Sequence, residues 1–169
     1  NGGSTNGGNL TISAPIVNHG SGISGVTITS TMPSGTPGLV ILTGANTYSG
    51  QLRVVNSTLS VATANNVSTN GPLGNSALSV ILGSNGRNGT LRYSGATATS
   101  TKPFTLEAGG TGSFDVTTAA NTLTLSGVID GSGNLAKATG TGTLIISGNN
   151  SYTGTTTVSA GALVANHNS

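Results

Sequence analysis

The sequence contains no cysteine and no tryptophan, and only 5% of its 169 residues are charged. Without cysteine the chain can form neither a disulfide nor a thiolate metal site. No apolar run reaches the roughly 18 residues of a membrane-spanning helix, so we expect no membrane insertion by this segment. Residues 1–9 lack the charged and apolar regions of a signal peptide, which predicts either a signal already removed or an excised fragment.

Charge of either sign is also too sparse for nucleic-acid binding. Five Lys and Arg residues stand against three Asp and Glu residues, spread thinly along the chain. A nucleic-acid footprint needs neighbouring cations with aromatic residues between them, and none is present. We therefore predict no nucleic-acid partner, and nothing in the sequence indicates a cofactor.

The chain has instead 28 glycines and many Thr, Ser and Asn residues, with Val, Ile and Leu at regular intervals. These polar residues disfavour helices, and no apolar stripe follows the helical period of 3.6 residues. The composition is typical of many short strands joined by tight turns.

One stretch of the chain occurs twice. Residues 142–164, GTLIISGNNSYTGTTTVSAGALV, align without a gap with residues 38–60. Each copy contains a polar Asn-x-Tyr-x-Gly turn between two strands. We predict a structural role for this turn: Asn holds a left-handed conformation, Gly relieves strain, and the Tyr ring covers the edge of a coil. The alternative is a tyrosine that contacts carbohydrate. The turn positions in the two copies are Gly44, Asn46, Tyr48, Gly50, Gly148, Asn150, Tyr152 and Gly154.

Short apolar segments recur at near-regular spacing, with no helix between them. The expected strands before the second copy are Leu10–Ile16, Val26–Ser30, Leu39–Thr43, Leu52–Val55, Leu59–Val61, Ala77–Leu82, Thr90–Ser94, Pro103–Glu107, Ser113–Thr117, Thr122–Ser126 and Asn134–Ala138. Parallel strands that are reached by going once round a coil, without a helix crossover, favour a right-handed parallel β-helix.

We therefore predict an all-β fold, a right-handed parallel β-helix (β-solenoid) of roughly six to eight coils. It forms a single domain over residues 10–165, with repeat units at 38–61 and 142–165. A flexible lead-in (1–9) and a tail (166–169) flank it, and irregular loops are expected near Pro33 and Asn66.

Alternation along each strand assigns the inward side chains, because successive residues point to opposite faces. Stacking these residues coil upon coil would form a narrow apolar column. The predicted column consists of Leu52, Val54, Leu91, Phe104, Leu106, Phe114, Val116, Leu123, Leu125, Leu144, Ile146, Val158 and Leu163.

The stretch from Leu135 to Leu163 resembles the autotransporter-associated β-strand repeat of bacterial passenger domains. That family's pattern runs roughly L-x-K-x-G-x-G-T-L-x-L-S-G-x-N-x-Y-x-G-x-T-x-V-x-x-G-x-L, and Lys137 and Tyr152 fall on it. The copy at 38–61 is similar but lacks the Lys and the G-x-G-T-L lead. The resemblance implies an extracellular or cell-surface β-solenoid with a structural or adhesive role, and it supplies no catalytic residues.

The two ends of the predicted coil stack suggest a partner. An open terminal coil exposes unpaired backbone groups and an apolar column, and neither end of the sequence carries a cap. We predict a non-enzymatic extracellular rod at the bacterial surface or in its matrix. It would be either a passenger segment with flanking coils of a longer chain or a self-stacking fibre subunit.

Two other functions stay open. As an adhesin, the rod would display the loops Thr31–Gly38 or Ser84–Gly89 to a host glycan or protein. As a polysaccharide-active enzyme, it would use Glu107 and Asp115, which fall on outward positions of successive predicted strands and so would stand side by side.

The remaining polar residues carry weaker hypotheses. His19 and His167 have no partner at the spacing of metal ligands, so we predict no metal site. The threonines at 155–157 and at 122 and 124 suggest an ice-binding array, but the neighbouring outward positions are expected to be Arg92, Glu107 and Asp115. Those charges would break the array.

Overall fold

The computed structural model describes residues 8–30 and 38–166. All regular structure in these residues is β, and every strand ladder in them is parallel. The strands are β1 (Leu10–Ile12), β2 (Val26–Thr29), β3 (Leu39–Leu42), β4 (Leu52–Val55), β5 (Ser57–Val61), β6 (Val80–Leu82), β7 (Asn88–Tyr93), β8 (Ala98–Ser100), β9 (Phe104–Leu106), β10 (Thr111–Val116), β11 (Thr122–Leu125), β12 (Ile129–Gly131), β13 (Asn134–Lys137), β14 (Thr143–Ile146), β15 (Thr156–Val158) and β16 (Ala162–Ala165).

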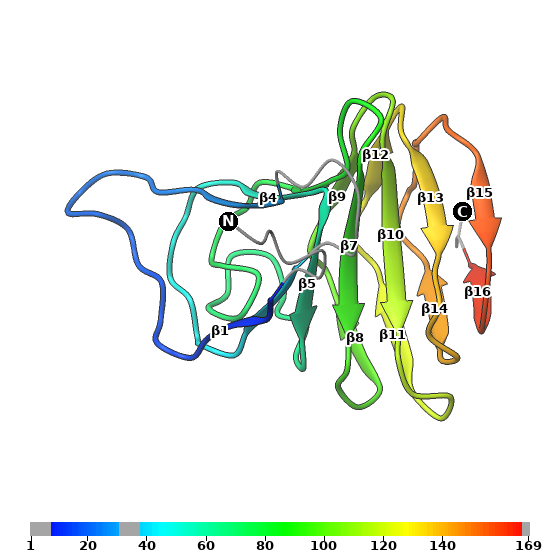
Figure 1. Ribbon diagram of the computed structural model, residues 1–169, viewed down its shortest axis with the longest axis horizontal. Helices are drawn as coiled ribbons and strands as arrows, with labels where there is room; N and C mark the ends of the chain where they lie inside the picture. The colour runs from blue at the N-terminus through cyan, green and yellow to red at the C-terminus, as the bar shows by residue number, and fades with distance from the viewer. Residues whose placement is uncertain (1–7, 31–37, 167–169) are drawn as a thin grey trace, which may run out of the picture.

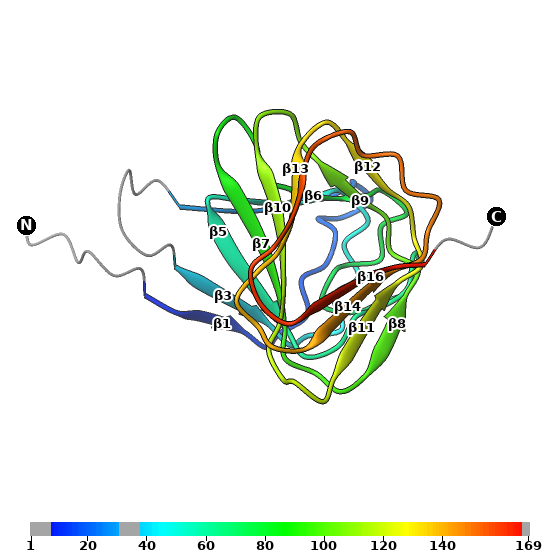
Figure 2. The ribbon, with the colours of Figure 1, turned by 90° about the vertical axis from the view of Figure 1, so that its right-hand side faces the viewer.

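The strands form three sheets that enclose one interior. A seven-stranded sheet has the order β1-β3-β5-β7-β10-β13-β15, a four-stranded sheet β16-β14-β11-β8, and a five-stranded sheet β12-β9-β6-β4-β2. Figure 1 shows the coils side by side along the long axis, and Figure 2 looks along that axis at the three walls. The chain is a parallel β-solenoid of about 6 turns, which confirms the predicted fold class.

Each coil visits the sheets in the same order. The chain runs along the seven-stranded sheet, crosses the line of the four-stranded sheet, follows the five-stranded sheet and then begins the next coil. Strands β10, β11 and β12 make one complete coil of this kind. Where a strand is absent, backbone still continues the stack: the Thr47 N–H donates to Ile16 O at 3.0 Å along the line of the four-stranded sheet.

The interior is a set of in-register columns. On the seven-stranded sheet, Leu59, Leu91 and Phe114 stack directly upon one another. The Phe104 and Phe114 rings meet edge to face at a centroid distance of 5.2 Å, which joins two walls of the core. Of the predicted column, the following residues are buried, each at most 4% exposed: Leu52, Val54, Leu91, Phe104, Leu106, Phe114, Val116, Leu123, Leu125, Leu144 and Ile146.

The two repeat copies do not occupy equivalent places around the axis. The first copy begins with β3 on the seven-stranded sheet, whereas the second begins with β14 on the four-stranded sheet. The Asn-x-Tyr-x-Gly turn therefore lies along the line of the four-stranded sheet in the first copy. In the second copy it lies along the line of the five-stranded sheet. The same local unit fits any wall of the solenoid, because it needs only a coil on each side.

An irregular excursion between β5 and β6 includes Asn66, near the position expected for a loop. Asn65 organises it: its Nδ2 donates to Thr69 O and Gly74 O, each at 2.9 Å, and its Oδ1 accepts from Leu73 N–H at 2.9 Å. The other expected loop, near Pro33, lies outside the described residues. So does most of the predicted lead-in and tail.

Candidate functional site

The interior copy of the Asn-x-Tyr-x-Gly turn joins three coils. Asn46 is 1% exposed, and its Oδ1 accepts from Ile16 N–H at 2.8 Å in the coil before. Its Nδ2 donates to Pro72 O at 3.2 Å in the coil after. Buried amides need such partners, since an unpaired polar group in the core is costly. Asn46 thus connects successive coils through its side chain.

The tyrosine of this copy lies in the core. Tyr48 is 0% exposed, and its ring covers Gly74, where an added methyl group would overlap the ring and where φ is +74°. The expectation that the ring covers a coil edge is therefore wrong for Tyr48, because the next coil closes over it. Its hydroxyl is buried without a hydrogen-bond partner among the described residues, and burial raises the pKa of Tyr48 above its usual range.

Close approach of neighbouring coils explains the glycines of both copies. None of Gly44, Gly50, Gly148 and Gly154 has a positive φ, and neither do the two turn asparagines. An added Cβ at Gly50 would lie 2.5 Å from the backbone of Ser24 in the preceding coil. The predicted left-handed turn and strain relief are wrong here. The glycines instead leave room for the backbone of the coil before.

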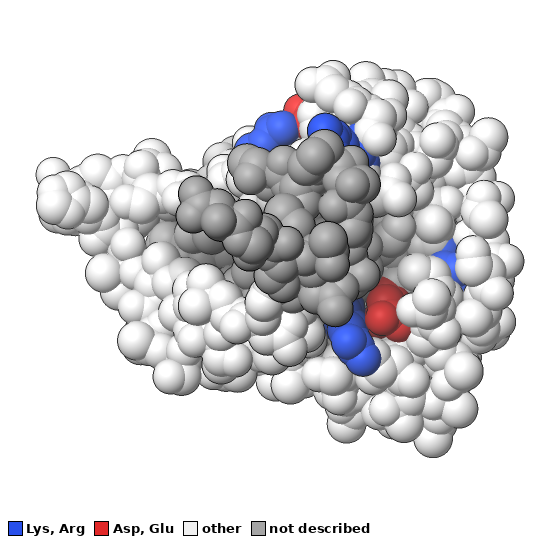
Figure 3. Space-filling model, in the orientation of Figure 1, with Lys and Arg blue, Asp and Glu red and all other residues white. Residues whose placement is uncertain are grey.

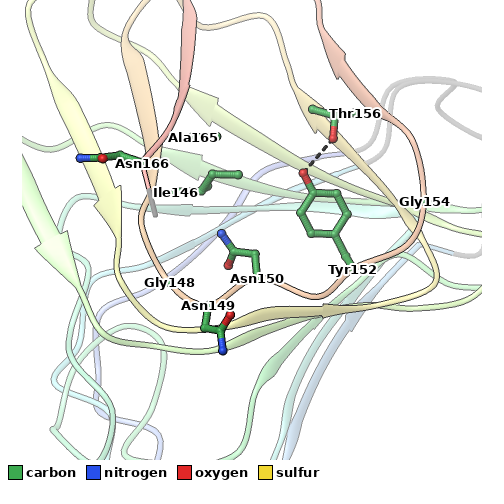
Figure 4. A pocket seen from close by; sticks show the side chains of 9 residues that line it. All are labelled: Ile146, Gly148, Asn149, Asn150, Tyr152, Gly154, Thr156, Ala165 and Asn166. Carbon is green, nitrogen blue, oxygen red and sulfur yellow. Dashed lines mark hydrogen bonds between the residues drawn. The ribbon is translucent and has the colours of Figure 1, made fainter. Parts of the chain in front are cut away.

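The terminal copy makes only half of these contacts. Asn150 Oδ1 accepts from Ile129 N–H at 2.9 Å, as Asn46 does from the coil before it. Asn150 Nδ2 has no partner among the described residues, and Tyr152 is half-exposed with its hydroxyl 2.8 Å from Thr156 Oγ1. Figure 4 shows these side chains around an open hollow that Ile146 and Ala165 also line.

The interior copy shows what fills the equivalent space. There, Gly71 N–H donates to Asn46 O at 3.2 Å and Asn75 N–H donates to Tyr48 O at 2.9 Å. Both donors come from the coil that follows. The hollow at Asn150 and Tyr152 therefore has the backbone acceptors and the ring surface that receive a coil in the interior.

The opposite end of the solenoid exposes an apolar hollow. Its lining includes Ile12, Ile16, Val26, Ile28 and Leu42. These are inward or partly buried positions of the first coils, and Leu10 beside them is 54% exposed. Both ends of the described stack thus present interior chemistry to solvent.

Two residues of the predicted core column differ from expectation for the same reason. Val158 is 51% exposed, although it stands in register with the buried Lys137. Leu163 is only half-buried, in register with Leu144. Both point inward as predicted. The prediction that Val158 lies in the core is wrong because no coil covers it in the described chain.

Two lysines, which were not among the predicted core residues, are completely buried. Lys102 Nζ donates to Gly74 O at 2.8 Å and Ser76 O at 2.7 Å, and Lys137 Nζ donates to Gly140 O and Ala160 O. Burial lowers the pKa of Lys102 to about 8 and also lowers that of Lys137. For Lys137, burial could have been predicted from alternation along β13, because Lys137 is two residues after the inward Leu135. Each lysine satisfies carbonyls at a corner between coils.

The remaining charges are few and scattered over the surface in Figure 3. Arg53 contacts Glu107 at 2.6 Å, and the Ser84 and Arg53 hydrogen bonds lower the pKa of Glu107. Arg92 Nε lies 3.6 Å from Asp115 Oδ2. Glu107 follows β9 of the five-stranded sheet, whereas Asp115 is on β10 of the seven-stranded sheet. The predicted side-by-side carboxylate pair is therefore wrong.

The other polar hypotheses find no support in the geometry. His19 is exposed, and His167 lies outside the described residues. No cluster of metal-ligating side chains occurs in residues 8–30 and 38–166. The threonines of β15 and β11 are on different sheets, and in register with Thr124 of β11 stands Ile145 of β14. An uninterrupted threonine array is absent from the described faces. Of the charges expected to break it, Arg92 and Asp115 lie on the same sheet as β15, whereas Glu107 follows a strand of the five-stranded sheet.

Comparison with known proteins identifies the repeats. The passenger-associated transport repeat matches residues 37–61 and 138–165. The adhesin BmaC autotransporter of Brucella suis biovar 1 (strain 1330) is 44% identical over 129 residues, which are 73% of this chain and 4% of that protein. The chain thus spans a small part of its relative's length. No solved structure matches it.

These matches confirm the resemblance that the sequence pattern indicated. Both matched segments include the Asn-x-Tyr-x-Gly turn, so the family repeat and the inter-coil contacts coincide. Among the described residues, no helix is long and apolar enough to cross a membrane.

Proposed function

The chain carries the repeats of autotransporter passengers, a family that points to the bacterial surface or the extracellular space, and from this premise we propose its role. It is one segment of a non-enzymatic rod whose coils continue end to end. The neighbours are either flanking coils of a longer polypeptide or further copies of the chain itself.

The contrast between the two turns carries this proposal. Asn46 and Tyr48 are closed over by a following coil, whereas Asn150 and Tyr152 present the same groups to an open hollow. The apolar hollow lined by Ile12 and Ile28 provides a second surface of interior character. Apolar surface of this kind favours association, at about 25 cal/mol per Å² buried.

Sedimentation velocity over a concentration series tests stacking between copies. The matched variants are Val158→Gln and Val164→Gln, two exposed valines of the last strands. Val158 points along the interior column, whereas Val164 is next to the inward Leu163 and points outward. We expect association of the wild type, weakened about tenfold by Val158→Gln, and no change with Val164→Gln.

A strictly monomeric wild type at high concentration would eliminate the self-stacking fibre. The rod would then continue only through coils of its own polypeptide. Filaments seen by electron microscopy at neutral pH would favour the fibre instead.

A second candidate function is adhesion through a projecting turn, because the similar Brucella protein is named an adhesin. Asn85, Gly86 and Arg87 are exposed at the tip of a tight turn that the Ser84–Arg87 bridge closes. The double variant Asn85→Gly and Arg87→Ser keeps the length and backbone bonds of the turn and should abolish cell binding while the melting temperature stays near that of the wild type. Undiminished cell binding would eliminate this turn as the adhesive element. The other loop expected to be displayed, Thr31–Gly38, lies almost wholly outside the described residues.

A further inference from the structure

The outer side of the seven-stranded sheet carries a polar groove that coil stacking does not use. Its floor crosses β5, β7 and β10 and reaches the turn after β13. Thr58, Thr90 and Ser113 stand in register along it, one from each strand. Since neighbouring strands are about 4.8 Å apart, the groove is long in the direction of the rod axis. Its shape therefore suits an extended polymer.

The lining is made of hydrogen-bonding groups. Apart from Leu39 and Ala138, the described lining residues are Asn, Thr, Ser, Arg and Asp, and none is aromatic. An apolar peptide would find little surface to bury there. A hydroxyl-rich ligand would find donors and acceptors at each step along the axis.

Arg92 is the exposed charge of this groove. Its side chain is 44% exposed, and its guanidinium donates no hydrogen bond within the described part of the chain. At 3.6 Å, the contact with Asp115 is an ion pair without a hydrogen bond, so the planar guanidinium fork keeps its donors. Carboxylates are the ligands that this fork binds best, through two parallel hydrogen bonds.

Asp115 does not prevent Arg92 from binding the carboxylate of a ligand. Its side chain is 12% exposed and lies below Arg92, with Oδ1 buried. Its charge also acts on Lys137, whose pKa it raises against the larger lowering by burial. A second arginine, Arg87, lines an adjoining hollow that shares Thr58 and Thr90 with the groove. The exposed charge along this surface is therefore positive.

We propose that the groove binds a linear acidic polysaccharide, with Arg92 holding a uronate carboxylate and the threonine and serine hydroxyls contacting the sugar hydroxyls. The site lies on the wall of the rod, between its ends. It goes beyond the proposed rod and does not depend on which coils stack.

Isothermal titration of the full chain with oligogalacturonate tests the site, with dextran oligomers as the neutral probe. We expect saturable binding of oligogalacturonate and none of dextran. Arg92→Gln should weaken binding about tenfold or more, as expected for loss of a bidentate charge-assisted contact. Arg53→Gln removes the same charge from the five-stranded sheet and should bind like the wild type.

A second pair of variants blocks the groove without changing the charge of the protein. Thr90→Tyr fills the floor and should block binding, whereas Thr99→Tyr, exposed on the four-stranded sheet, should not. Circular dichroism and a melting curve check that each variant is folded. Absence of saturable oligogalacturonate binding, equal binding of dextran, or equal losses with Arg92→Gln and Arg53→Gln would overturn the proposal. Sedimentation reports on stacking separately, so failure of either proposal is recognisable.

Discussion

The two copies of one sequence unit differ in their contacts mainly because a further described coil covers the first copy and none covers the second. Tyr48 is 0% exposed and Asn46 bonds to the coils on both sides. Tyr152 is half-buried, and among the described residues the Asn150 side chain bonds only to the coil before it. The local sequence therefore determines the contacts to the preceding coil. The following coil supplies the rest of the burial.

This difference explains how a chain with so few charges and aromatic residues holds together. In a solenoid, each unit contacts only its neighbours, so stability is approximately a sum over interfaces. A residue inside the stack contributes to two interfaces and a residue at an end to one. Matched substitutions in the two settings test this directly.

The largest expected contrast is within one interior column. Phe114 and Val158 both point inward on the seven-stranded sheet, separated by Lys137. Phe114→Asp removes a fully buried ring and places an unpaired carboxylate in the core, so we expect it to unfold the neighbouring coils. Val158→Asp should lower the free energy of unfolding by less than about 1 kcal/mol, because that side chain is already solvated. Thermal melts check both, and an unchanged melting temperature for Phe114→Asp would make the assignment of faces wrong.

The turn tyrosines give the next contrast. Tyr48→Ala should lower the free energy of unfolding by about 3–5 kcal/mol, the usual range for deletion of a buried ring. Tyr152→Ala should lower it by only about 1 kcal/mol, since that ring is only partly buried and has no coil over it among the described residues. Urea titrations measure both values. Equal losses would mean that the following coil adds little to the burial of Tyr48.

The buried lysines extend the contrast to pH. Lys102 has its pKa lowered from 10.5 to about 8 by burial, so between these values the unfolded chain binds more protons than the folded one. Stability should therefore rise as the pH increases through this window. Lys102→Met should flatten the rise measured by urea titration from pH 7.5 to 10.5. Lys137→Met should flatten it less, because Asp115 partly restores the pKa of Lys137. A flat wild-type profile would contradict the lowered value.

The fold could be predicted because its signals are local. Alternation in segments such as Leu52–Val55 gives the inward side chains, and the repeated turn shows that the unit recurs. Strands β8 and β12 were missed, because Ala-Thr-Ser and Ile-Asp-Gly contain almost no apolar alternation. Both are placed by their neighbours: Ser100 pairs with Leu125, and Ile129 pairs with Phe104.

What sequence reasoning could not give is the position of each unit around the axis. Coils differ in length because excursions such as the one at Asn65 add residues without adding a strand. The sheet that carries Glu107 or Asp115 therefore cannot be counted from spacing, and the predicted carboxylate pair failed for this reason. The groove around Arg92 was equally invisible, since Thr58, Thr90 and Ser113 come from three coils of unequal length.

The smallest expected effect is that of removing the tyrosine hydroxyl, and it has opposite signs in the two copies. The Tyr48 hydroxyl is buried without a partner among the described residues, so Tyr48→Phe removes an unsatisfied polar group and should raise the free energy of unfolding by about 1 kcal/mol. Tyr152→Phe removes an exposed contact with Thr156 and should lower it by less than about 0.5 kcal/mol. Urea titration of both variants in parallel measures the two signs. A loss of stability with Tyr48→Phe would show that the hydroxyl is satisfied inside the stack, and the two copies would then differ in burial but not in hydrogen bonding.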